Sequence, residues 1–221
     1  MKVTLINYTQ NPIGAIEEAA STCYNSKPSN GAIMKHCYNS GHHSVLEFAD
    51  FHFKIEGISR ATSHQLVRHR LASFAQRSQR YCKEDGFEYV TPETIAENET
   101  INKTYTHLMS TIETFYELAT TMGIPEEDAR FILPNACTTE INVKMNLREL
   151  IHFMNERLCT CAQWEIREMA ILMREEVLKV CPDLKDMLVP KCEQHDEFPY
   201  CPESPKRSCG RHKTISELTK N

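Results

Sequence analysis

The segment SRATSHQLVRHRLASFAQRSQRY (Ser59–Tyr81) carries five arginines, although the whole chain has a formal net charge of −5. A guanidinium group is planar and permanently charged, and its donors match the oxygens of phosphate and carboxylate groups. The glutamines and serines between the arginines add directional hydrogen bonds. The segment therefore predicts a pocket for a phosphorylated small molecule. The alternative is a solvated arginine-rich surface, because charge runs are common there.

The spacing within the segment favours the pocket. Ser59 is a suitable helix N-cap, and Ala61, Leu66 and Val67 give the following helix an apolar side. On that helix Gln65, Arg68 and His69 would be three or four positions apart, so that their side chains converge. Beyond Arg70 the apolar period is lost, which predicts an extended loop.

The same residues resemble a known family. Arg68-His69-Arg70, seven further residues and then Ser78-Gln79-Arg80-Tyr81 are similar to the signature of the flavin-dependent thymidylate synthases, as are the lead-in residues Ser59–Ala61 and His64–Val67. The similarity extends from about Met34 to about Leu172. It implies an FAD-dependent enzyme that methylates dUMP to dTMP, with 5,10-methylenetetrahydrofolate as carbon donor and NADPH as reductant. It also implies a homotetramer with sites at subunit interfaces and no protein nucleophile on the uracil ring.

The resemblance assigns two sets of binding residues. Those expected to contact dUMP are Gln65, Leu66, Val67, Arg68, Gln76, Arg77, Ser78, Gln79, Arg80, Arg130 and Arg157. Those expected to contact FAD are Ser44, Glu47, Arg68, His69, Arg70, Gln76, Asn146, Leu147, Arg148 and His152. The chain departs from the family pattern at Ala75, where many members carry a polar residue, at Gln76, which replaces a glutamate, and at His152, which replaces an asparagine.

Physical chemistry separates the roles within these sets. Arg80 and Arg130 suit the 5′-phosphate, and Arg157 suits negative charge developing on the uracil. Arg157 and His42 are the residues predicted to be catalytic, His42 by its resemblance to a histidine beside the flavin. Ser78 is predicted to bind phosphate, because a serine without a base is a poor nucleophile.

For three of these residues a structural role is the alternative. Asn146 could be a plain helix N-cap, which is compatible with a ligand contact. Arg157 could pair with Glu156 or with the C-terminal end of its helix. Glu47 could be a partner of an arginine or the flavin, or a surface carboxylate.

Composition limits the class of protein. With 221 residues and 41% hydrophobic content, the chain can form one domain with a full core. It lacks a secretory pattern and a long apolar run, so we expect a cytoplasmic protein without membrane contact. A pI near 6.1 argues against nucleic-acid binding. In that compartment most of the ten cysteines should be reduced thiols.

Periodicity predicts an α/β (α+β) domain over residues 1–180, with a mostly antiparallel sheet flanked by long helices. Strands are expected at Val3–Ile6, from Phe48 and at Thr138–Met145, because apolar and polar residues alternate in the last two. Helices are expected at Pro12–Cys23, Gly31–Tyr38, Ile101–Met122, a short one after Pro125, Asn146–Leu158 and Ala162–Val180. The seven glycines form no GxGxxG loop, so a flavin would not bind through a Rossmann fold.

Residues 181–221 form a separate extension rich in cysteine and proline. Its Cys181, Cys192, Cys201 and Cys209, with His195 and His212, are possible zinc ligands. The spacings are wide and contain no C-x-x-C pair, which favours a proline-stiffened tail packed on the domain or a neighbour, without metal.

Two other functions are alternatives. A cysteine-dependent thymidylate synthase would need an activated thiol, for which Cys137 is the candidate. A binding module for RNA or phosphoproteins would use the arginines alone; it would bind polyanions in a salt-sensitive way and hold no flavin.

Overall fold

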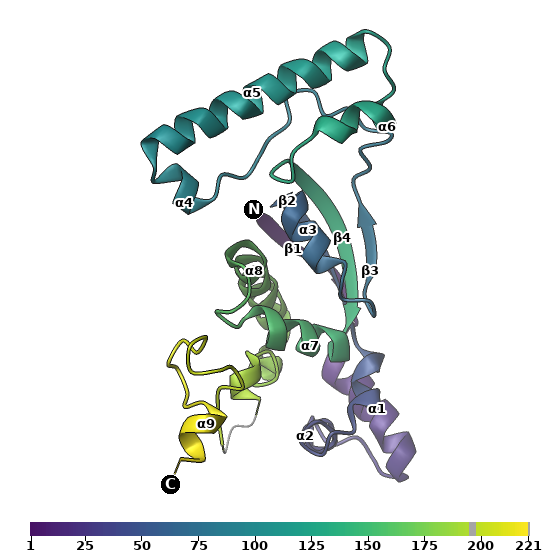
Figure 1. The fold of residues 1–221 in the computed structure, drawn as a ribbon. Coiled ribbons are helices and arrows are strands. Elements are labelled where there is room, and N and C mark those ends of the chain that lie inside the picture. Colours follow the sequence, from purple (N-terminus) through teal and green to yellow (C-terminus); the bar gives the residue numbers. More distant parts are fainter. Residues whose placement is uncertain (195–197, 221) are drawn as a thin grey trace. The chain divides into compact units, whose positions relative to one another are not determined.

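The arginine-rich segment begins where strand β2 (Asp50–Ser59) ends and helix α3 (Arg60–Leu66) starts (Figure 1). The structure is a computed structural model and describes residues 1–194 and 198–220. In β2 the buried Phe51, Phe53 and Ile55 alternate with partly exposed residues. The predicted period of two is therefore confirmed.

Within the described residues, the strands form one four-stranded, mostly antiparallel sheet in the order β1-β2-β4-β3. Its other strands are β1 (Lys2–Tyr8), β3 (Ser73–Gln76) and β4 (Thr138–Asn146). In β4 the apolar side chains of Ile141, Val143 and Met145 are buried. The fold class predicted from the sequence is confirmed, because helices flank this sheet.

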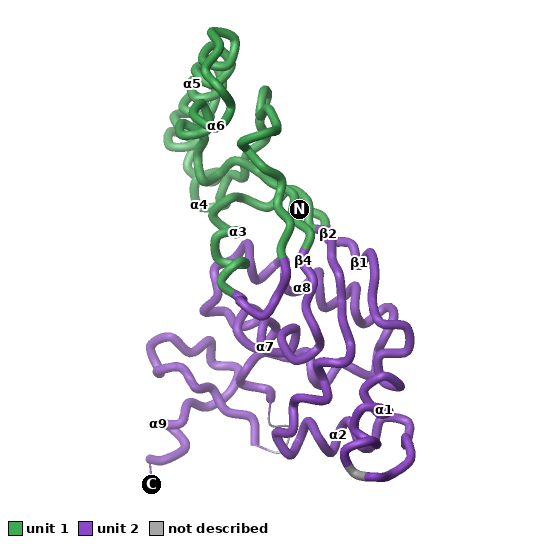
Figure 2. The backbone as a smooth tube through the Cα atoms, turned by 90° about the vertical axis from the view of Figure 1, so that its right-hand side faces the viewer, with its two compact units in different colours: residues 1–2, 55–68, 74–142 green, residues 3–54, 69–73, 143–221 purple. Residues whose placement is uncertain are grey.

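The chain divides into two compact units built from interleaved segments (Figure 2). Unit 1 contains residues 1–2, 55–68 and 74–142, and unit 2 contains the remaining described residues. The unit boundaries fall within strands β2 and β4, so neither unit is a single run of sequence. The separation of residues 1–180 from a tail stays a prediction.

Unit 1 is dominated by the long helix α5 (Glu99–Thr121). It contacts α4 (Glu93–Ala96), α6 (Glu126–Ala129) and the 3-10 turn η2 (Arg130–Ile132). Its Met109 and Tyr116 are buried, and Tyr105 and Ile112 are partly buried against a small core. The apolar stripe predicted for this helix is therefore only partly buried. Its other members are exposed to solvent in the single chain: Ile101, Leu108, Phe115 and Met122.

Unit 2 contains the other long helices. They are α1 (Pro12–Tyr24), α2 (Ala32–Asn39), α7 (Leu147–Arg157) and α8 (Trp164–Val180). The turn η1 (His43–Phe48) contacts α1, α2 and α7, and α7 also contacts α8. The buried faces of α7 and α8 supply much of the core of this unit, including Phe153, Met154, Ile166 and Met173.

The C-terminal part of unit 2 has little regular structure. It contains the 3-10 turns η3 (Pro182–Leu184) and η4 (Lys191–Glu193), and the short helix α9 (Ile215–Leu218). Cys201 and Thr214 form an isolated bridge between two loop segments. Among the residues described, no helix combines the length and the apolar character needed to span a bilayer.

Candidate active site

The arginine-rich segment folds differently from the prediction in two respects. The Ser59 hydroxyl accepts a hydrogen bond from the Thr62 N–H at 3.1 Å, so the predicted N-cap is confirmed. The helix, however, ends at Leu66, and Arg68 and His69 lie beyond it. The shared helix face predicted for Gln65, Arg68 and His69 is therefore wrong. The segment past Arg70 is also more than a loop, because Ser73–Gln76 pair with the sheet as strand β3.

In unit 1, the two arginines predicted to bind phosphate meet at one acidic residue. Arg80 donates from Nε and Nη2 to the Glu127 carboxylate, at 3.1 and 2.9 Å. Arg130 donates from Nε to the backbone carbonyl of the same residue at 3.1 Å. The structure thus brings Arg80 and Arg130 together around Glu127. The hydrogen bond with Glu127 raises the pKa of Arg80.

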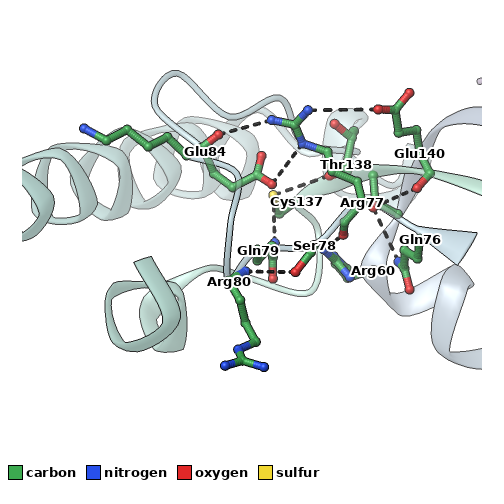
Figure 3. A network of polar contacts seen from close by, with 12 residues as sticks. Arg60, Gln76, Arg77, Ser78, Gln79, Arg80, Glu84, Cys137, Thr138 and Glu140 are labelled. Carbon is green, nitrogen blue, oxygen red and sulfur yellow. Dashed lines mark hydrogen bonds and ion pairs between the residues drawn. The ribbon is translucent and has the colours of Figure 1, made fainter. Parts of the chain in front are cut away.

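Arg77, in contrast, is bound by carboxylates within the protein. Its Nε donates to the buried carboxylate of Glu84 at 3.2 Å, and its Nη1 lies 4.0 Å from the Glu140 carboxylate (Figure 3). Its backbone N–H donates to the Glu140 carbonyl, and its own carbonyl accepts from Arg60. The hydrogen bond with Glu84 is the main cause that raises the pKa of Arg77. The guanidinium expected to contact dUMP is therefore committed within the protein.

The remaining polar residues of this loop point in different directions. The Gln76 amide donates to the Ser63 hydroxyl at 2.9 Å, and the Gln79 amide faces the Cys137 sulfur at 3.8 Å. The Ser78 hydroxyl accepts from the Arg80 N–H at 3.2 Å (Figure 3). No described side chain provides Ser78 with a general base through a hydrogen bond. Ser78 is therefore placed to support the Arg80 turn and not to attack a substrate.

Cys137, the nucleophile of the alternative enzyme, is buried with Phe87 and Met109 in the small core of unit 1. Burial raises the pKa of its thiol to about 11, and the Glu84 carboxylate adds to the effect. A thiol with such a pKa is almost wholly protonated near neutral pH, whereas nucleophilic cysteines have lowered pKa values. Cys137 is thus a core residue.

The residues around the end of α3 differ in exposure. Leu66 is fully buried, so its side chain belongs to the core and only its backbone could reach a ligand. Val67 is exposed and Gln65 is partly buried. Arg68 and Arg70 are exposed, and their guanidinium groups form no hydrogen bond or ion pair within residues 1–194 and 198–220. These two cations are therefore open to an anionic ligand.

In unit 2, helix α7 begins with the Asn146 side chain accepting from the Glu149 N–H at 2.9 Å. The N-cap alternative is confirmed. Leu147 is fully buried and its N–H donates to the Ala49 carbonyl at 2.8 Å, which leaves neither its side chain nor its N–H for a ligand. Arg148 donates to the Glu47 carboxylate at 2.6 Å, so the partner predicted for Glu47 is an arginine.

Two residues of the same helix, Glu149 and Arg157, flank His69; Glu149 and His69 are buried, and Arg157 is partly buried. The Nδ1 of His69 lies 3.2 Å from the Glu149 carboxylate, and Arg157 donates from Nε to the His69 Nε2 at 3.1 Å. Because Nε2 accepts a hydrogen bond, the proton of the neutral ring must be on Nδ1, where it is donated to Glu149. Burial, followed by the charge of Arg157, lowers the pKa of His69 to about 4. Burial also raises the pKa of Glu149.

The contact with His69 uses only the Nε of Arg157. The terminal nitrogens of its guanidinium form no hydrogen bond or ion pair elsewhere in the part of the chain that the structure describes, and no described ion pair joins it to Glu156. The His69 ring also meets the edge of Phe153, with centroids 4.9 Å apart. The His69 side chain, expected to contact FAD, is instead enclosed and orients Arg157.

Three further predicted residues are exposed. His42 precedes η1 and donates its backbone N–H to the Cys37 carbonyl, and Ser44 is the second residue of that turn. His152 lies on α7, with its ring centroid 5.7 Å from that of His69. His43, whose ring contacts the Tyr38 carbonyl, is structural.

Sequence reasoning missed the acidic residues that organise these arginines. Glu127 is shared by Arg80 and Arg130, Glu84 holds Arg77, and Glu149 orients His69. Glu127 is 47 residues from Arg80 and Glu149 is 80 residues from His69, and Glu84 is joined to Arg77, seven residues earlier, through a loop without helical spacing, so spacing carried no signal. For Glu149 there was a local signal, because an acidic residue three positions after an N-cap is a common helix start.

Comparison with known proteins gives one consistent result. Residues 4–183 match the family described as thymidylate synthase complementing protein. The flavin-dependent thymidylate synthase of Geobacter sulfurreducens is 42% identical, with 99% of this chain and 97% of that protein covered. The enzymes of the same name from Pyrococcus furiosus and Pyrococcus horikoshii are 43% and 44% identical, covering 92% and 100% of this chain and 90% and 98% of theirs.

Proposed function

This chain belongs to the flavin-dependent thymidylate synthase family, and we therefore propose that it converts dUMP to dTMP with 5,10-methylenetetrahydrofolate as carbon donor and NADPH as reductant. The observation that carries the substrate assignment is the pair Arg80 and Arg130 gathered at Glu127. Arg80 is held by the Glu127 carboxylate and Arg130 by the backbone carbonyl of the same residue, so a phosphate that displaces the carboxylate from Arg80 would lie beside both guanidinium groups.

The residues present fit an anionic flavin nucleotide such as FAD. Arg68 and Arg70 are exposed and unpaired among the described residues, and Arg148 is half exposed beside the start of α7. We propose that they neutralise the pyrophosphate, with Asn146, Ser44 and His152 contributing polar contacts. When bound, FAD would supply the redox chemistry that links oxidation of NADPH to completion of the methyl group.

The residues of the chain bind and polarise the uracil nucleotide. Arg80 and Arg130 are assigned to the phosphate, and Gln65 and Gln76 to the ribose or base edge. Arg157 is assigned to the uracil, where its fixed charge stabilises negative charge that develops on the ring. The neutral His69 accepts from Nε, so the outer face of the guanidinium remains available for the substrate. His42 is proposed to line the entry of the folate or nicotinamide.

No protein nucleophile is assigned to the uracil ring. Cys137 is buried with a raised thiol pKa, and Ser78 has no described base. Both observations support a mechanism in which the chain positions ligands and stabilises charge.

Absorption spectroscopy tests the proposal. The purified protein should show a flavin band that NADPH bleaches in the presence of dUMP, and dTMP should form when methylenetetrahydrofolate is added. Reconstitution with FAD that gives neither a flavin band nor dTMP would refute it. Salt-sensitive RNA binding by that colourless protein would support the binding module instead.

We also propose a homotetramer. The support is the exposed row on α5 and its C-cap, in which Ile101, Leu108, Phe115 and Met122 recur every seven residues, together with Phe131, which is 84% exposed. Large apolar side chains in a continuous row normally mark an interface. Phe115→Glu should lower the mass measured by light scattering, whereas Glu113→Gln, a control on the same helix, should not; a wild-type monomer would contradict the proposal.

A further inference from the structure

Half of the cysteines line one small cavity in unit 2. Five of the ten thiols surround it: Cys159, Cys161, Cys192, Cys201 and Cys209. The cavity has a volume of only about 20 Å³. Organic ligands need pockets of roughly 300 Å³ or more, whereas a space of this size holds a single water or ion. The cavity therefore has both the size and the lining of a metal site.

The ligand atoms already lie close together. The thiols of Cys159 and Cys161 and a carboxylate oxygen of Glu203 are all within 4.8 Å of one another. The thiol of Cys192 forms a second such group with Glu193 and His212. Each of the two groups contributes a thiol, Cys159 or Cys192, to the lining of the same cavity.

The five thiols are not equivalent. Cys159 follows the end of α7, Cys192 lies in η4, Cys201 is buried in its bridge with Thr214, and Cys209 lies in the last loop before α9. Cys161 differs, because its thiol donates to the Arg207 carbonyl at 3.4 Å. Cys161 is also only two residues from Cys159, so Cys159, Cys192, Cys201 and Cys209 are the four thiols from separate segments available to one tetrahedral ion, and Cys161 is the thiol used as a hydrogen-bond donor.

We propose that Cys159, Cys192, Cys201 and Cys209 bind a structural zinc ion as thiolates. Tetrahedral coordination by four cysteines is a standard structural zinc site, with Zn–S distances of about 2.3 Å. Such a centre carries two net negative charges. The cavity lining also contains three cations that offset this charge, Lys191, Arg207 and Arg211. It contains the carboxylate of Glu203 as well.

The packing of the tail explains why an ion is needed. From Lys191 onward, Cys201 and Thr214 are the buried residues among those described. Its helical elements, η4 and α9, are three and four residues long. A segment with so little buried apolar surface needs a cross-link, and metal binding can supply that folding free energy.

This assignment changes the sequence-based view of the tail in three ways. Cys181 does not line the cavity, and Cys159 and Cys161, which precede the tail, do. His212 lies beside Cys192 but is not needed as a ligand. His195 lies outside the described residues.

Elemental analysis tests the proposal on the full-length chain, produced without a histidine tag and purified without chelators. We expect about one zinc ion per chain, as a four-thiolate site binds one ion. Cys209→Ser should remove it; this thiol is exposed, so the substitution leaves the core intact. Cys161→Ser, and Cys23→Ser at an exposed site on α1, should both retain it.

A second measurement covers the case in which a variant folds poorly. Wild-type protein treated with a zinc chelator should unfold at a lower temperature, and added zinc should restore it, whereas Cys209→Ser should respond to neither. Cobalt(II) should replace zinc and give the visible absorption of a tetrahedral thiolate site. The proposal is overturned by metal-free wild-type protein, by zinc that survives Cys209→Ser, by zinc lost from Cys161→Ser, by iron with acid-labile sulfide, or by disulfides among these cysteines.

Discussion

The Nε of Arg157 donates to the Nε2 of His69, 3.1 Å away, inside unit 2. A guanidinium cannot lose its proton in a protein, so this contact requires an unprotonated Nε2. Burial, followed by the charge of Arg157, keeps the ring neutral, and the hydrogen bond to Glu149 on its other side fixes the proton on Nδ1. His69 is therefore a positioning residue for the arginine assigned to the uracil.

The lowered pKa of His69 predicts a pH-dependent stability. Unfolded histidine binds a proton near pH 6.5, whereas folded His69 binds one only near pH 4. Between these values only the unfolded state gains the proton, so stability falls as the pH falls, by on the order of 3 kcal/mol in all. The amide of His69→Gln can still donate to Glu149 and accept from Arg157. In this variant the free energy of unfolding, measured by urea titrations at several pH values, should lose this dependence on pH. Equal slopes in both proteins would refute the assignment.

Arg157 should affect turnover more than binding. Arg157→Ala should lower kcat by about 100- to 1,000-fold, the range for loss of one stabilising donor at a developing charge. Arg157→Lys keeps the charge but loses the Nε contact with His69, so it should recover only part of the activity. Steady-state dTMP formation with dUMP varied measures both; a change in KM alone would remove Arg157 from the chemical step.

Arg80 and Glu127 should have opposite effects on dUMP affinity. Arg80→Ala should weaken dUMP binding by about 10- to 100-fold while the flavin stays bound, because a charge-assisted phosphate contact is lost. Glu127→Gln should tighten it by about two- to five-fold, since an exposed ion pair no longer competes. Isothermal titration of the flavin-loaded protein measures both. Parallel changes in the two variants would contradict the exchange of carboxylate for phosphate.

Arg77 should be needed for stability. Arg77→Met leaves the carboxylate of Glu84 buried without its partner and should lower the free energy of unfolding by about 2 kcal/mol. Glu84→Gln in the same chain should restore part of that loss. Denaturant melts of the two single variants and the double variant test the coupling, and additive losses would show that the pair is not coupled.

Neither candidate nucleophile should be essential. Ser78→Ala and Cys137→Ala should retain turnover within about tenfold of the wild type, because each loses at most a neutral hydrogen bond or packing contact. Single-turnover assays with both ligands bound are the measurement. Abolished chemistry in either variant, with ligand affinities unchanged, would restore that residue as a nucleophile.

The fold was predictable where a periodic pattern coincided with burial. Phe51, Phe53 and Ile55 alternate in sequence and are buried in the strand, and Pro12 opens the helix expected there. The strand Ser73–Gln76 was not predicted, because it is four residues long and its ladder partner, β4, lies more than sixty residues later. Helix α3 ends at Leu66 although its polar pattern continues, and from His69 the chain belongs to the other compact unit, which a local pattern cannot show.

For the site, the sequence indicated the kinds of residue but not how each is used. Five arginines in one segment suggest five contacts to an anion, yet Arg77 and Arg60 brace the loop. Arg60 donates to the Arg77 carbonyl 17 residues later and Arg77 to the Glu84 carboxylate 7 residues later, and a single sequence contains no information about those pairings. His69 was assigned to a ligand for the same reason, and its partners Glu149 and Arg157 lie eighty or more residues away.

The carboxylate of Glu127 gives this protein a resident anion at the place assigned to the nucleotide phosphate. A molecule with the same base and sugar but no phosphate, such as deoxyuridine, could not displace it, since breaking the contact with Arg80 would bring no compensating charge. The protein would then discriminate between nucleotide and nucleoside through Glu127, a competing anion that is part of its own chain.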